Sequence, residues 1–270
     1  MPSVISTDGT TIAYSALGSG PSVLVIPGAL SMAADLLPFA RALAEHYRVH
    51  LLERRGRGES GPQGEHYGMQ TECDDILAVQ RATGAERLVG HSYGGLVALE
   101  VACTSSVFRK VAVYEPGVSI TGSVRAEWMT EYRSHLAQAR PDEAFVDFVL
   151  GSQPRGERQL PRALMKMILA VAIRGSQRKR MYSLLGENLR EHEQIVKLDD
   201  TYSRYWQITA EVLLMCGGAR RSASDCGVVE TLAGVIPRAR QFTFPKLGHF
   251  ALQGRRAGEV ARVVAGFMAE

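Results

Sequence analysis

Residues 88–95 read LVGHSYGG, and this short stretch restricts the fold more than any other part of the chain. A short apolar run leads to Ser92, and a helical pattern begins at Tyr93. Gly90 and Gly94 lie two residues before and two residues after the serine, where a tight strand-to-helix turn leaves no room for larger side chains. The pattern predicts a strained serine whose hydroxyl stands exposed at the carboxyl end of a buried strand, as in a nucleophile elbow.

The first 116 residues alternate between strand-like and helix-like segments. Continuous apolar, β-branched runs predict strands that are buried on both faces, and apolar residues at helical spacing predict the helices between them. The predicted strands are 22–27, 48–53, 87–90 and 110–115, and the predicted helices are 33–46, 69–83 and 93–103. This order implies a parallel sheet covered by helices, to which residues 11–17 add an antiparallel strand near one edge.

The alternation stops after residue 116 and resumes after residue 207. The chain between these points has several helix-like segments and no clear strand. Beyond them, strands are predicted at 211–216 and 240–244, and helices near 225–234 and 257–269. We therefore predict an α/β fold with a mostly parallel central sheet flanked by helices, formed by residues 1–116 and 208–270 and interrupted by a helical cap over residues 117–207.

A serine hydroxyl needs a general base to become a good nucleophile, and His249 is the best-placed histidine. It follows the predicted strand 240–244 and precedes the last predicted helix, so it should lie on the same carboxyl edge of the sheet as Ser92. A histidine late in the chain also agrees with the order of residues in enzymes that carry this turn. His91 is adjacent to the serine, but successive side chains diverge at such a turn, which favours a packing role.

Composition argues against several other classes of protein. Apolar residues make up 46% of the chain and charged residues 22%, which is typical of a soluble globular protein. A formal charge of +3 is too small to indicate nucleic-acid binding. The sequence shows neither a signal peptide nor a run of about 18 apolar residues, so we expect no membrane partner and a cytoplasmic location. Frequent arginine and alanine fit a bacterial source.

Two further patterns point away from metals and cofactors. The four cysteines are widely spaced and do not cluster with histidines, so free thiols in a reducing compartment are expected. They are Cys73, Cys103, Cys216 and Cys226. Residues 56–61, GRGESG, match the spacing of a dinucleotide-binding turn, but Pro62 follows where that turn would open a helix, which indicates a surface loop. No cofactor or metal is therefore predicted.

With these motifs the chain resembles the α/β-hydrolase superfamily over nearly its whole length, and within it the serine esterase and lactonase-like branch that carries a helical cap. The resemblance rests on IPGA (26–29), ERRGRGES (53–60), GHSYGG (90–95) and LGH (247–249). It implies an α/β-hydrolase fold and an oxyanion hole formed by two backbone N–H groups. One belongs to Tyr93 and the other to Ala29, in a loop where Pro27 replaces the histidine common in the family.

The carboxylate that would orient His249 has two candidates. Most members of the superfamily carry it just after the strand that follows the cap. That stretch here reads MCGGARRSASD (215–225), with Arg220 near the expected position. Asp225 lies a few residues further on, in the predicted helix. Glu115 ends the strand that follows the nucleophile helix, where some relatives place their acid. We favour Glu115, and Asp225 stays open.

The site and the resemblance together predict a serine hydrolase that cleaves a carboxylic ester or lactone of a small, largely apolar substrate through an acyl-enzyme. An acyltransferase or thioesterase with the same residues is the alternative, and the basic stretch 174–180 would then dock a phosphate-bearing carrier or thioester. A non-catalytic binding protein is a third class, which the intact Ser92 and His249 disfavour. The sequence fixes neither the substrate nor the oligomeric state, and it leaves a homodimer open.

Overall fold

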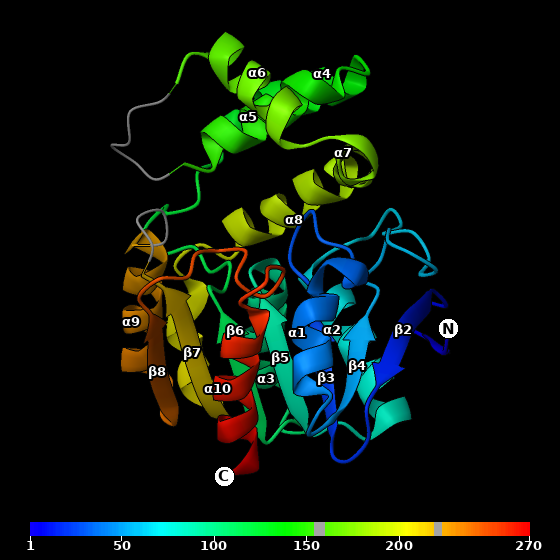
Figure 1. The fold of residues 1–270 in the computed structure, drawn as a ribbon, viewed down its shortest axis with the longest axis vertical. Helices are drawn as coiled ribbons and strands as arrows, with labels where there is room; N and C mark the ends of the chain where they lie inside the picture. Colours follow the sequence, from blue (N-terminus) through cyan, green and yellow to red (C-terminus); the bar gives the residue numbers. More distant parts are fainter. Residues whose placement is uncertain (154–159, 219–222) are drawn as a thin grey trace.

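The computed structural model describes residues 1–153, 160–218 and 223–270, with residues 223–225 described by their backbone alone. Within these ranges, eight strands form one sheet in the order β1-β2-β4-β3-β5-β6-β7-β8 (Figure 1). The strands are β1 Ser3–Ile5, β2 Thr11–Leu17, β3 Ser22–Ile26, β4 Arg48–Leu52, β5 Arg87–His91, β6 Lys110–Tyr114, β7 Glu211–Gly217 and β8 Ala239–Phe244. The mostly parallel sheet predicted from the sequence is confirmed.

Only the β1–β2 and β2–β4 pairs are antiparallel among the described strands, and all pairs from β4 to β8 are parallel. Residues 11–17 form the predicted antiparallel strand β2. The short β1, which the sequence did not indicate, pairs with β2 at the edge of the sheet. Its three residues carry no periodic pattern long enough to be recognised.

The central strands are buried on both faces, as their continuous apolar runs require. Along β3, Leu24 and Ile26 face one layer of the core, while Val23 and Val25 face the other. Outside residues 117–207, three α-helices pack on the first face and two on the second in the described part of the chain (Figure 1). The first three are α2 Met69–Thr83, α3 Tyr93–Thr104 and α9 Ala223–Val235, and the other two are α1 Leu37–Leu43 and α10 Ala257–Ala269.

The predicted helix 33–46 begins with a different geometry. Residues Ala33–Leu36 form a 3₁₀ helix, and the α-helix α1 starts only at Leu37. Pro38 explains the change, because proline has no N–H to donate and fits an α-helix only in its first turn. The helix therefore starts next to the proline rather than running through it.

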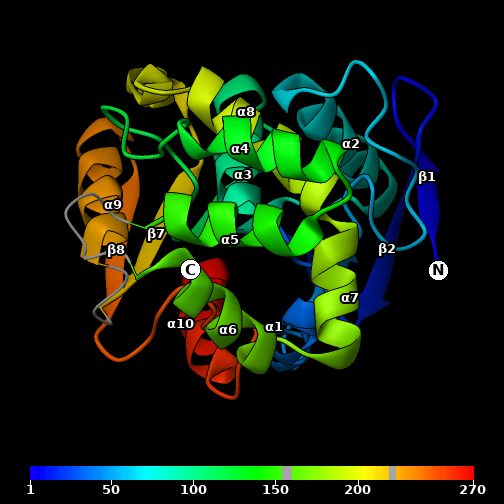
Figure 2. The ribbon, with the colours of Figure 1, turned by 90° about the horizontal axis from the view of Figure 1, so that it is seen from above.

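Between β6 and β7 the chain leaves the sheet and forms the helices α4 to α8, which we call the helical insertion. They lie above one end of the strands in Figure 1, and Figure 2 views them from above. Their bounds are α4 Trp128–Ala137, α5 Pro141–Gly151, α6 Arg162–Ala172, α7 Gly175–Ser183 and α8 Leu185–Lys197. Large apolar side chains such as Trp128, Phe145 and Leu189 hold them together. Across the described ranges, α6 included, no helix has both the length and the apolar content needed to cross a bilayer.

The expectation of four free thiols is wrong for two of them. Cys216 at the end of β7 and Cys226 in α9 form a disulfide, with their Cα atoms 5.4 Å apart. Because α9 packs against β7, two cysteines separated by 10 positions in the sequence become neighbours, a proximity that spacing alone did not reveal. Cys73 and Cys103 are free, as expected, and burial raises the pKa of both thiols.

Loss of the Cys216–Cys226 disulfide should lower the free energy of unfolding by about 2–3 kcal/mol, because the bond restricts a short loop in the unfolded chain. Denaturant unfolding of a Cys216→Ser, Cys226→Ser double variant against the parent protein would measure this difference. Cys103→Ser is the control, since Cys103 is free and half-buried. Equal free energies of unfolding for the double variant and the parent protein would contradict the prediction.

Candidate active site

Ser92 occupies the turn between β5 and α3, and its backbone is strained. Its φ of 55° lies in the left-handed region, which residues other than glycine rarely adopt. Strand β6 holds the turn in place, because the Ser92 N–H donates to the Tyr114 carbonyl oxygen at 3.0 Å. An added Cβ at Gly90 would lie 2.3 Å from the Gly94 oxygen, and one at Gly94 would lie 2.4 Å from the Ile26 oxygen. These contacts explain why both positions require glycine.

The ring of His249 lies between Ser92 and Glu115. Its Nε2 atom is 3.1 Å from the Ser92 Oγ, and its Nδ1 atom is 2.7 Å from the Glu115 Oε2. Both distances are those of hydrogen bonds. The Glu115 side chain is fully buried, whereas the His249 side chain is 37% exposed. The structure therefore brings the three residues named from the sequence into one hydrogen-bonded series that a solute can reach from the histidine side.

Glu115 is held from two sides at the point where the chain leaves β6. A buried carboxylate must be paired or hydrogen-bonded to offset its lost hydration. Its Oε1 accepts the Gly217 N–H at 2.8 Å, and its Oε2 faces His249. The Glu115 N–H donates to the Met215 carbonyl oxygen at 2.8 Å, and a φ of 44° turns the backbone away from the strand. Both carboxylate oxygens are thus oriented by the end of β7 and by the histidine.

The alternative acid, Asp225, has a side chain that lies outside the described residues, as does Arg220. The backbone of Asp225 falls in the first turn of α9. The Nδ1 atom of His249 already has the Glu115 carboxylate beside it at 2.7 Å. This geometry favours Glu115 as the partner of the histidine.

His91 and Tyr114 support the loop that carries His249. The His91 Nε2 is 2.8 Å from the His249 carbonyl oxygen, and the Tyr114 hydroxyl donates to the Gly248 carbonyl oxygen at 3.0 Å. Because a carbonyl oxygen only accepts, the Nε2 of His91 carries the proton. Burial, reinforced by the nearby His249, lowers the pKa of His91 to about 3, so its ring is neutral near pH 7. The sequence indicated packing for His91 but not this contact.

The loop after β3 passes directly beside the serine. An added Cβ on Gly28 would lie 2.9 Å from the Ser92 Cβ, so only a backbone without a side chain can approach this closely. Leu30 has a φ of 52°, which turns the chain sharply after Ala29. In the part of the chain that the structure describes, neither the Ala29 N–H nor the Tyr93 N–H has a backbone acceptor. Two donors are therefore available to stabilise negative charge.

A group of buried charges that contacts the loop after β3 was not predicted from the sequence. The loop after β4 contains three arginines, each only 1% exposed, and residues 56–61 within it contain no helix, as predicted. Arg57 lies within the expected surface loop, yet it turns inward like Arg54 and Arg55 before it, and buried charge must be paired. The ion pairs are Arg54 with Glu72 and Glu191, Arg57 with Glu191, and Arg55 with Asp75 and Asp8. Acidic partners so distant in sequence carry no local signal.

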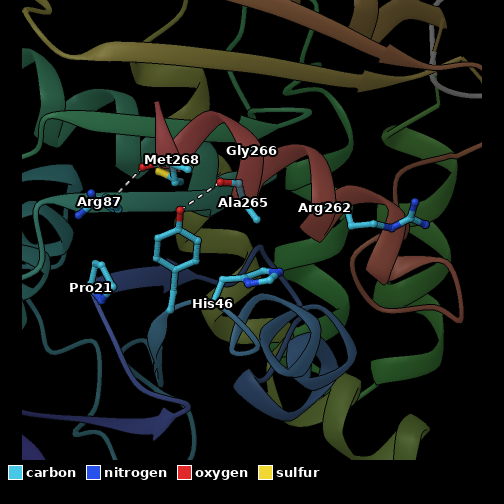
Figure 3. A pocket seen from close by; sticks show the side chains of 9 residues that line it. Pro21, His46, Arg87, Arg262, Ala265, Gly266 and Met268 are labelled. Atoms are coloured by element: carbon cyan, nitrogen blue, oxygen red, sulfur yellow. Dashed lines mark hydrogen bonds between the residues drawn. The ribbon is translucent and has the colours of Figure 1, made fainter.

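A separate pocket lies at the other end of the parallel strands, where β4 and β5 begin. It has a volume of about 500 Å³ and is lined by the end of α10 and the starts of β4 and β5 (Figure 3). Two of its polar groups bind backbone carbonyl oxygens: the Tyr47 hydroxyl donates to Ala265, and the Arg87 Nε donates to Met268. The residues around His249 do not line this pocket. We therefore assign it no part in the chemistry at the serine.

Comparison with curated proteins finds relatives that match only in part. A pimeloyl-[acyl-carrier protein] methyl ester esterase of Xanthomonas campestris pv. campestris is 31% identical over 97 residues, which are 36% of this chain and 37% of that protein. A protein of Agrobacterium fabrum named as the carbamate hydrolase RutD is 32% identical over 85 residues, 30% of this chain and 33% of that protein. The chain thus matches only about a third of the length of each of these curated relatives.

Comparison with solved structures covers the whole fold. A crystal structure of an alpha/beta hydrolase from Sphaerobacter thermophilus DSM 20745 matches with a TM-score of 0.84 and 28% identity, over 99% of this chain and 100% of that one. The enol-lactonase from Burkholderia xenovorans LB400 matches with a TM-score of 0.74 over 100% of both chains, and its 19% identity indicates a shared fold alone. Residues 23–263 match the profile of the alpha/beta hydrolase family, and because this range includes the sheet from β3 onwards, the elbow and the insertion, the chain belongs to that family.

Proposed function

We propose that this chain is a serine hydrolase that cleaves a carboxylic ester or lactone of a small, largely apolar substrate through an acyl-enzyme. The observation that supports it most is the series Ser92–His249–Glu115, joined by contacts of 3.1 Å and 2.7 Å. A serine, an acid and a histidine in this chain order are the catalytic residues of related folds. The curated relatives are named for ester and carbamate cleavage, which agrees with the same class of reaction.

In the proposed reaction, the Ser92 Oγ attacks the carbonyl carbon of the substrate while the His249 Nε2 takes the hydroxyl proton. The Ala29 and Tyr93 N–H groups donate to the oxyanion that forms. His249 then gives its proton to the departing alkoxide, and an acyl group remains on the serine. A water molecule, deprotonated by His249, then attacks the acyl-enzyme, and His249 returns this proton to the Ser92 Oγ as the acid leaves. Glu115 stabilises the charged imidazolium in both halves of the reaction.

We further propose that residues 117–207 act as a cap over a catalytic core formed by residues 1–116 and 208–270. The apolar cluster of the helical insertion supports this role, because ligand sites are lined largely by apolar and aromatic side chains. Trp128 and Phe148 pack edge-to-face with His192 of α8, the insertion helix that contacts the loop after β4 through Glu191. Such a cap would select for apolar acyl or alcohol groups.

A fluorophosphonate probe tests the proposed function directly, because it labels a serine only when that serine is activated. The parent protein should be labelled at Ser92 and should hydrolyse members of a panel of esters and lactones of varied acyl length. Ser92→Ala should be neither labelled nor active. Labelling at a different serine, or hydrolysis that persists in Ser92→Ala, would contradict the assignment.

An acyltransferase or thioesterase is the second candidate, and the charge of the insertion favours it. Residues 162–180 contain six basic residues and no acidic residue, and four of the six form ion pairs with carboxylates of other segments. Arg174 and Lys179 of this stretch are exposed, as a site for an anionic carrier would require. The ester panel separates the candidates if it is repeated with added alcohols, thiols and amines and with carrier-bound acyl esters. Transfer faster than hydrolysis, or a strong preference for the carrier-bound ester, would favour this second candidate.

A further inference from the structure

Arg54 contacts the backbone next to Ala29 and the side chain of Tyr93, the two residues that carry the oxyanion donors. Its Nη1 lies 3.3 Å from the Gly28 carbonyl oxygen and 3.5 Å from the Pro27 carbonyl oxygen. Its guanidinium carbon lies over the ring of Tyr93, 4.5 Å from the ring centre. A cation over an aromatic face is attracted by the negative charge of that face, more strongly where water is excluded. One buried side chain therefore contacts the loop after β3 and the first residue of α3.

The contact between Arg54 and the Gly28 carbonyl oxygen restrains the direction of the Ala29 N–H. The Gly28 carbonyl and the Ala29 N–H belong to one peptide unit, which is planar and trans. Its oxygen and hydrogen point in opposite directions, so a donor that holds the oxygen also fixes the direction of the N–H. Arg54 holds the oxygen from the buried side. The Ala29 N–H is thereby directed away from Arg54, and the loop that carries it passes beside Ser92 at Gly28.

Arg54 is itself fixed by two carboxylates. Glu72 of α2 accepts from the Arg54 Nε at 3.1 Å and from the Nη2 at 2.6 Å, a bidentate pair that sets the plane of the guanidinium. The Tyr67 hydroxyl donates to the same Glu72 and lies 3.1 Å from the Tyr93 hydroxyl. Burial alone would raise the pKa of Glu72, yet the charge and hydrogen bonds of Arg54 lower it, so the pair is charged.

The second carboxylate comes from the helical insertion. Glu191 of α8 is fully buried and accepts from the Arg54 Nη2 at 2.8 Å and from the Arg57 Nη2 at 2.7 Å. The Arg57 Nε in turn donates to the Ser31 carbonyl oxygen at 2.9 Å. Two arginines that bind one insertion carboxylate thus also hold backbone oxygens before and after Ala29.

We propose that Arg54 is a positioning residue of the oxyanion hole, which orients the Ala29 N–H through the Gly28 carbonyl, supports Tyr93 through its ring, and links both to the helical insertion through Glu191. This inference rests on the proposed serine-hydrolase function. It gives the insertion a part in catalysis, because a displacement of α8 would move Arg54 and with it the donors. Arg54 acts through these groups and does not touch the substrate.

Arg54→Lys tests the inference, because lysine keeps the charge but loses the bidentate fork and the flat face over Tyr93. The kcat for a good ester should fall about 10²-fold while KM changes by less than about threefold, since the loss falls on the transition state. Arg55→Lys is the matched control. Arg55 is equally buried and ion-paired to Asp75 and Asp8, and none of its described hydrogen bonds reaches the loop after β3 or Tyr93.

A trifluoromethyl ketone supplies a readout that a purely structural role would not move. This inhibitor adds to the serine and forms an oxyanion, so its affinity should fall in Arg54→Lys by the same factor as kcat/KM and should stay unchanged in Arg55→Lys. Equal kcat values and equal inhibitor affinities in the two lysine variants would overturn the inference. Failure of the parent protein to react with a fluorophosphonate would instead refute the proposed function, so the two outcomes are distinct.

Glu191→Gln carries the test if Arg54→Lys does not fold. Glutamine keeps the shape of the side chain but removes the charge that pairs with Arg54 and Arg57. We expect kcat and inhibitor affinity to fall together by roughly tenfold, with KM little changed, since a small misplacement of the donors lowers transition-state binding. A folded Glu191→Gln protein with both values at the parent level would refute the link between the helical insertion and the oxyanion hole.

Discussion

Ser92→Ala is expected to lower kcat about 10⁶-fold while the protein keeps its fold, because the hydroxyl is the only group that the proposed reaction acylates. The small alanine side chain fits the strained position, where a φ of 55° excludes bulky or branched residues. Steady-state hydrolysis of the best ester found in the panel measures the loss. Circular dichroism and the thermal midpoint establish that the fold persists. Ser106→Ala, an exposed serine after α3, is the control and should retain the parent rate.

A double variant sharpens this prediction, since residues that act as a unit are not additive. His249→Ala alone should cost about as much as Ser92→Ala, and the pair together should cost no more than either one. The acceleration over the uncatalysed reaction that remains should come from the oxyanion donors and substrate binding alone. A double variant that is slower than each single variant by a further large factor would indicate that the two residues act independently, which contradicts the proposed proton transfer.

The residues nearest the chemistry were the most predictable from the sequence. Ser92 follows from a local pattern, because the strand, the helix and the two glycines that the tight turn requires are adjacent in the sequence. His249 required only the alternation of strands and helices, which places the ends of parallel strands at one edge of the sheet. The fold was predictable for the same reason, since buried strands and amphipathic helices have distinct periods along the chain. Local signals thus gave most of the architecture.

The contacts that support the site were not predictable, because they join segments that are distant along the chain. Arg54 and Glu191 are 137 positions apart, and His91 meets the His249 carbonyl across 158 positions. Nothing in the loop after β4 distinguishes an arginine that turns inward from one on the surface. The Cys216–Cys226 disulfide spans only 10 positions, and it was missed because it depends on how α9 packs against β7.

Glu115→Gln is expected to lower kcat roughly 10⁴-fold with little effect on stability. The glutamine carbonyl oxygen can still accept the Gly217 N–H, so the amide nitrogen must face the Nδ1 of His249. That nitrogen donates rather than accepts, which favours the tautomer with its proton on Nε2. An Nε2 that carries a proton cannot take one from Ser92. The pre-steady-state rate of acyl-enzyme formation, measured alongside the thermal midpoint, separates this effect from unfolding.

Asp225→Asn is the matched comparison, because it removes the same charge at the other acid considered from the sequence. With Glu115 already 2.7 Å from the histidine, this variant should keep a rate close to that of the parent protein. Near-parent activity in Glu115→Gln together with a large loss in Asp225→Asn would assign the acid to the position most common in the family. A large loss in Glu115→Gln alone would assign the acid to Glu115, directly after β6 and two residues before the proposed cap begins at residue 117.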